Sequence, residues 1–155
     1  MKATIVISFI MLFCACSSNQ SSTEMPSLNG PCGYATRAEM EEALGVSLSE
    51  SPAEINEEYL GGRGCSFAGQ KEDTEAHFGY ITFPDASGFD SVKSGERVSG
   101  AGEEAYIING PDAQQLWVRE GDRFVMVAIG DVPRTEESKK LAALVLERLK
   151  TKPLN

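Results

Sequence analysis

The chain has 155 residues, with 23 acidic and 14 basic side chains and a formal net charge of −9 at pH 7. This charge repels phosphate backbones and anionic lipid headgroups, which argues against nucleic acid as a partner and against adsorption of the folded part to a bilayer surface. The length favours a single folded domain.

Residues 1–15 have the pattern of an export signal. Lys2 supplies a positive charge, and the apolar run at residues 3–13 is shorter than the roughly 20 residues that a membrane-spanning helix needs. Ala15 and Cys16 then resemble the lipobox of bacterial lipoproteins, in which a small residue precedes an invariant cysteine, although Phe13 stands where that motif usually has Leu. The resemblance implies cleavage before Cys16 and lipid on Cys16, a diacylglyceryl group often joined by an acyl chain such as palmitate. The alternative is an ordinary secretory signal with incidental cysteines.

A lipid-bearing Cys16 predicts a cell-envelope protein held on the bilayer by several acyl chains. The location would be the outer membrane in a Gram-negative host and otherwise the extracellular face of the cell membrane. Residues 16–31 then comprise the lipidated cysteine and a Ser-rich linker that has too few apolar residues to fold.

The two remaining cysteines, Cys32 and Cys65, are predicted to form a disulfide, because Cys14 leaves with the signal and Cys16 takes the lipid. The alternative is a metal site with two cysteine ligands. The single histidine and the lack of a Cys-x-x-Cys motif argue against it.

Residues 32–150 predict one globular domain, followed by a tail at 151–155. Thr36 and Glu39 have the spacing of a capping box at the start of a first helix, and Gly45 is typical of the residue just past a helix end. Residues 46–58 are acidic and only moderately apolar, which predicts a loop with room for a short helix after Pro52. Strands are expected at residues 65–68, 77–83, 105–109, 115–119 and 124–129, a short helix at 89–93, and a last helix at 136–150 capped by Thr135.

These elements predict an α+β domain, with an antiparallel sheet of four to five strands flanked by an N-terminal and a C-terminal helix. Residues 124–129 are apolar without a break, which indicates a central strand covered on both faces. Both long helices can lie on one side of the sheet. The other face would then be uncovered and would hold Trp117, with Arg119 at its rim, as a candidate binding face, because Trp and Arg are favoured at binding hot spots. The alternative places Trp117 in the core, for example beneath residues 46–58.

No catalytic, cofactor-binding or metal site is predicted. Residues 100–105 match the letters of a dinucleotide loop, but a strand follows them and two acids stand where phosphate would bind, so a tight turn is expected. His77 lies in a predicted strand without a Gly-x-Ser-x-Gly motif, which predicts a surface histidine rather than a triad member. The paired carboxylates along the chain are typical of a solvated surface.

The chain also resembles a family, the small uncharacterised secreted lipoproteins that are abundant in actinobacteria. The similarity lies in the lipobox, the Ser-rich linker, the cysteine pair and the stretch at residues 100–106, where Glu103 replaces the commoner Asp. The resemblance implies an envelope domain without assigned catalytic residues. We therefore expect a membrane-anchored, non-enzymatic domain that binds an envelope protein or a small ligand, with a small envelope hydrolase or hydrolase inhibitor as the alternative.

Overall fold

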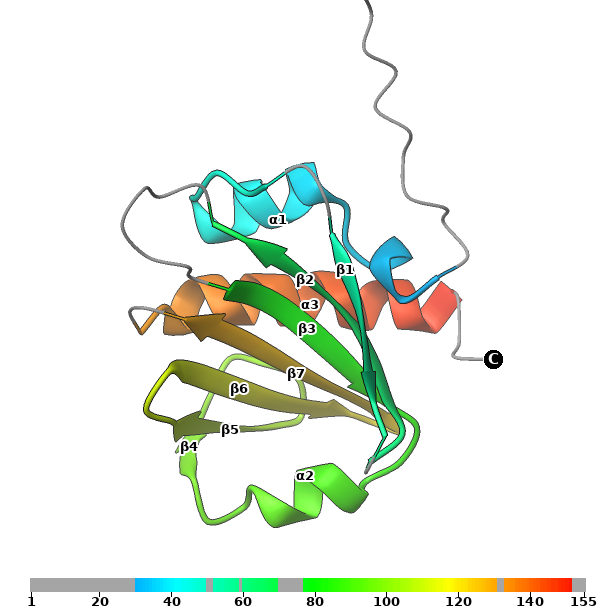
Figure 1. The fold of residues 1–155 in the computed structure, drawn as a ribbon. Coiled ribbons are helices and arrows are strands. Elements are labelled where there is room, and N and C mark those ends of the chain that lie inside the picture. The colour runs from blue at the N-terminus through cyan, green and yellow to red at the C-terminus, as the bar shows by residue number, and fades with distance from the viewer. Residues whose placement is uncertain (1–29, 50–51, 59, 70–76, 131–132, 152–155) are drawn as a thin grey trace, which may run out of the picture.

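A computed structural model describes residues 30–49, 52–58, 60–69, 77–130 and 133–151 of the chain (Figure 1). In chain order the elements are η1 (Pro31–Gly33), α1 (Arg37–Leu44), β1 (Ala53–Glu57), β2 (Gly62–Ala68), β3 (His77–Phe83), α2 (Ser87–Ser91), β4 (Glu96–Val98), β5 (Glu104–Asn109), β6 (Ala113–Glu120), β7 (Arg123–Gly130) and α3 (Thr135–Thr151). No helix in these ranges has the length and hydropathy that a membrane span requires.

The strands form one antiparallel sheet in the order β1-β2-β3-β7-β6-β5-β4. The α+β class and the antiparallel sheet are confirmed, but the sheet has seven strands rather than four to five. The two unexpected strands, β1 and β4, are its edges. The expectation of a loop at residues 46–58 is wrong where β1 forms. An edge strand tolerates charged residues and little apolar content, and β1 contains only Ile55 as a large apolar residue.

The larger hydrophobic cluster lies between the sheet and the two helices α1 and α3. We call the sheet face that these helices cover the first face, and the opposite face the second face. Figure 1 shows α1 and α3 together on one side of the sheet, as expected, and α2 apart from them. β7 lies in the middle of the sheet, between β3 and β6, and supplies alternate residues to both faces, as the apolar run predicted. The buried side chains of this cluster include Met40, Leu44, Cys65, Phe67, Phe78, Tyr80, Leu116, Val118, Val125, Val127, Ile129, Leu141, Val145, Leu146 and Leu149.

The start of α1 is fixed by the predicted capping box. The Glu39 N–H donates to the Thr36 hydroxyl, the Thr36 N–H donates to the Glu39 carboxylate, and Gly45 ends the helix at a φ of 66°. Glu39 also accepts a hydrogen bond from Arg148 of α3. Burial acts to raise the pKa of Glu39, but the bonds from Thr36 and the charge of Arg148 outweigh it and hold that pKa below 4.5. The two helices are therefore joined by a charge-assisted bond.

The two turns expected on either side of β5 and β6 are observed, whereas the short helix expected at residues 89–93 lies at Ser87–Ser91. Residues 100–105 form the expected tight turn into β5, with positive φ at Gly100 and Gly102, where a side chain would be strained. Gly121 and Asp122 connect β6 to β7 as a hairpin. Thr135, expected as the cap of the last helix, is its first residue, and its hydroxyl donates to the Gln114 side chain at 3.4 Å.

Candidate functional site

The predicted lipidation residue, Cys16, and the preceding signal lie outside the described residues. The structure therefore leaves the lipid anchor as a prediction. The described chain begins at Gly30, directly before η1.

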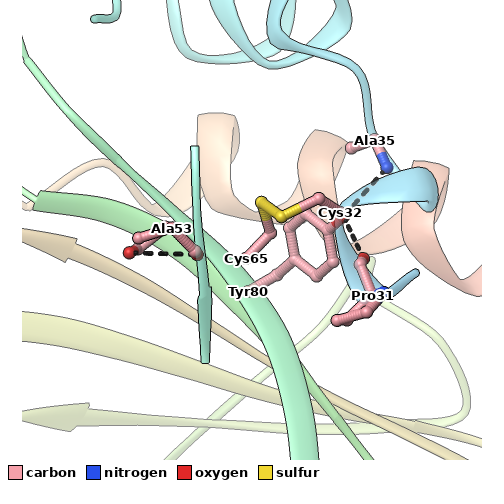
Figure 2. The surroundings of a disulfide bond; sticks show 7 residues. Pro31, Cys32, Ala35, Ala53, Cys65 and Tyr80 are labelled. Carbon is pink, nitrogen blue, oxygen red and sulfur yellow. Dashed lines mark hydrogen bonds between the residues drawn. A yellow bond between two sulfur atoms is a disulfide. The ribbon is translucent and has the colours of Figure 1, made fainter. Parts of the chain in front are cut away.

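Cys32 and Cys65 form the predicted disulfide, with their Cα atoms 4.8 Å apart. Figure 2 shows the bond between η1 and strand β2. Both residues are buried, Cys32 at 5% exposure and Cys65 at 0%. The bond thus fastens the N-terminal end of the described chain to the interior of the sheet.

Tyr80 adds a second fastening at the same place. Its hydroxyl donates to the Pro31 carbonyl at 2.8 Å and accepts from the Ala35 N–H at 3.1 Å, as Figure 2 shows. Tyr80 is also the register partner of Cys65 on the neighbouring strand. Burial raises the pKa of the Tyr80 hydroxyl well above its usual range, so the group stays a neutral donor. We call Cys32, Cys65 and Tyr80 the η1 clamp.

Sequence reasoning missed the role of Tyr80. The alternation of strand 77–83 correctly places Tyr80 on the same face as Phe78 and Thr82. A tyrosine on a buried face usually needs a hydrogen-bond partner for its hydroxyl, so the sequence could have indicated that Tyr80 makes such a bond. The identity of the partners depends on η1, which comes from a segment more than 40 residues away.

The expectation that Trp117 lies on an uncovered face is wrong. Trp117 is 7% exposed, and its ring stacks on Phe83 with centroids 5.0 Å apart. Its indole N–H donates to the Gln115 side chain at 3.1 Å. The face is covered there by α2 and the residues around it, because Phe89 and Val92 complete a second hydrophobic cluster. That cluster contains Ile81, Phe83, Phe89, Val92, Tyr106, Trp117, Phe124 and Met126.

Arg119 lies at the margin of this second cluster, with 38% of its side chain exposed. Its guanidinium nitrogens are 3.8 Å from Glu103 and 3.6 Å from Glu104. The Tyr106 hydroxyl also donates to Glu104, at 2.8 Å. Arg119 is therefore engaged in a local ionic group rather than presented alone beside an exposed tryptophan.

His77 begins β3 and is exposed, at the end of the sheet away from this group. Among the described residues, no three His, Cys, Asp or Glu side chains are placed to hold a metal ion. The ion pairs of Arg119 with Glu103 and Glu104 and the contacts of the η1 clamp connect parts of the fold to one another.

The described residues cover the second face only in part. On this face, Trp117 and its register partners are followed, on the side away from Phe124 and Arg119, by another row of residues in continuous register across six strands. The row consists of Ala53, Ser66, Gly79, Ala128, Gln115 and Ile108. We call it the open row. Ala53 is exposed, Gly79 is buried, and the other four are half-buried.

The open row has small side chains in its middle and no ionisable group. Ser66, Gly79 and Ala128 are direct neighbours on β2, β3 and β7. The side chain of Gln115, which lies next to Ala128, accepts a hydrogen bond from the indole N–H of Trp117. The second hydrophobic cluster therefore borders the row on one side. A partner that packs here could come close to the backbone of three strands and touch the edge of that cluster.

Comparison with protein-family models, with curated proteins and with solved structures finds no match to this chain. What the clamp and the open row do is therefore inferred from their own residues.

Proposed function

We propose that the protein is a cell-envelope lipoprotein, anchored in the bilayer through lipid on Cys16, whose domain is a non-enzymatic binding module for another envelope protein. The anchor is inferred from the Ala15-Cys16 junction after a short apolar run. The Cys32–Cys65 disulfide supports export, because disulfides are rare in the reducing cytosol and persist outside it.

The binding role rests on one observation, the open row. α1 and α3 cover the first face of the sheet, and α2 with its flanking residues covers one end of the second face. Within the described part of the chain, four of the six residues in the open row are half-buried, and the middle of the row holds only the small residues Ser66, Gly79 and Ala128. Partly uncovered apolar surface bordered by polar groups is typical of protein interaction sites.

We infer a protein partner with a positively charged rim around an apolar contact. A row that crosses six strands offers breadth, which suits a polypeptide segment, whereas small ligands are generally enclosed in concave pockets. The chain's net charge of −9 attracts a cationic partner over long range and repels anionic ones.

Site-specific photo-cross-linking in the native host tests this function. A photoreactive residue replacing Ala128, in the open row, should give one discrete adduct, and the same residue replacing Ala143, exposed on α3, should give none. Adding bulk and charge to the row with Ser66→Arg should reduce the Ala128-position adduct at least about tenfold, as loss of about 1.4 kcal/mol of affinity would. Equal adducts from both positions, or an adduct that persists with Ser66→Arg in a folded protein, would exclude the open row as the binding surface.

A further inference from the structure

The disulfide gives the domain a covalent connection that bypasses part of the backbone. Cys32 and Cys65 are 33 residues apart in sequence, and α1 and β1 lie between them. The predicted linker enters the domain at Pro31, directly before Cys32. A pull on the linker therefore reaches β2 through the disulfide without passing through α1 or β1.

The point of entry is fastened to β3 as well. Tyr80 bonds to Pro31 and Ala35 on either side of the disulfide-bonded cysteine, as Figure 2 shows. Cys65 and Tyr80 are register partners, so the two attachments reach adjacent positions on neighbouring strands. β3 is in turn hydrogen-bonded to β7, in the middle of the sheet.

The same strands present the open row on their opposite face. Ser66 follows Cys65 on β2, Gly79 precedes Tyr80 on β3, and the two are register partners. Successive residues of a strand point to opposite faces of a sheet. The η1 clamp and the middle of the open row therefore lie back to back on the same two strands.

We propose that the η1 clamp transmits the pull of the membrane anchor directly to the strands that hold the partner, so that α1 and β1 are spared from that load. The inference rests on the proposed function in two respects, since the linker carries load only when Cys16 is lipidated and the strands carry load only when a partner binds the open row. Without the disulfide the pull would act on the two hydrogen bonds of Tyr80 and then on α1. α1 is held only by non-covalent contacts, among them the burial of Met40 and Leu44 and the bond from Arg148 of α3 to Glu39.

Force spectroscopy on the mature chain, residues 16–155, tests the clamp. Handles are placed at the two ends, and Cys16→Ser leaves Cys32 and Cys65 as the two cysteines. The oxidised protein should unfold in one step without earlier lengthening. With Cys32→Ser and Cys65→Ser, a separate step at lower force should come first and release up to about 115 Å of chain, the extended length of the 33-residue separation.

Tyr80→Phe in the two-serine protein should lower the force of that first step further. Tyr106→Phe is the matched control, because its hydroxyl bonds only to Glu104 among the contacts described above, and it should leave the first step unchanged. One-step unfolding of the two-serine protein at the force of the oxidised protein would overturn the clamp. The protein in this experiment carries no lipid, so a failure here is separate from a failure to find lipid on native Cys16.

Discussion

Replacing Trp117 by Ala should destabilise the domain severely. The ring is 7% exposed, stacks on Phe83 and is bonded to Gln115 through its indole N–H. The substitution would open a cavity between the sheet and α2, where Gly88 lies so close that a Cβ there would be 3.2 Å from the Trp117 ring. Truncation of a buried Trp costs about 3–5 kcal/mol.

Thermal and urea unfolding followed by circular dichroism measures this cost. For a domain of this size each kcal/mol lowers Tm by about 4 °C, so a fall of roughly 12–20 °C is expected. His77→Ala is the control, since His77 is exposed and surface substitutions stay within about 0.5 kcal/mol. A fall of less than about 4 °C for Trp117→Ala would refute the packing of α2 on this face and would restore Trp117 as a surface residue.

Three further outcomes follow from the described contacts. Removing the disulfide with Cys32→Ser and Cys65→Ser should cost about 3.5 kcal/mol in urea unfolding, and two alkylatable thiols in freshly unfolded native protein would contradict the bond. Tyr80→Phe leaves the buried partners of the hydroxyl without it and should cost about 1–3 kcal/mol, against a much smaller loss for Tyr106→Phe; equal losses would show that the clamp bonds add nothing. The lowered pKa of Glu39 stabilises the fold above pH 4.5, and this contribution is lost as the pH falls through the folded-state pKa, so Glu39→Gln should flatten the acid limb of a stability–pH curve; an unchanged slope would rule out that linkage.

Features that depend on neighbouring residues were predictable from the sequence. The capping box of α1 is a four-residue signal, and α3 has its apolar residues at helical spacing. The run at residues 124–129 correctly indicated a central strand, because a strand in the middle of a sheet that packs on both faces is typically an unbroken run of apolar residues. The disulfide followed from the count of cysteines in a chain expected to be exported.

Features that depend on distant contacts were missed or misplaced. β1 and β4 are edge strands whose charged residues do not alternate clearly with apolar ones, so their sequences resemble loops. The cover over Trp117 comes from α2, a five-residue helix with no periodic signal. The partners of Tyr80 are Pro31 on η1 and Ala35 just after it, a segment that the disulfide joins to the sheet. In each case the structure depends on contacts between residues far apart in the chain, which a local sequence pattern does not contain.

The anchor on Cys16 is the claim on which the cellular role depends most. Intact-mass and N-terminal peptide measurement of the protein purified from native membranes tests it directly. We expect a mature chain that begins at Cys16, carries the mass of a diacylglyceryl group with or without a further acyl chain, and partitions into detergent. A mature N-terminus without lipid, or a chain that retains residues 1–15, would contradict the account.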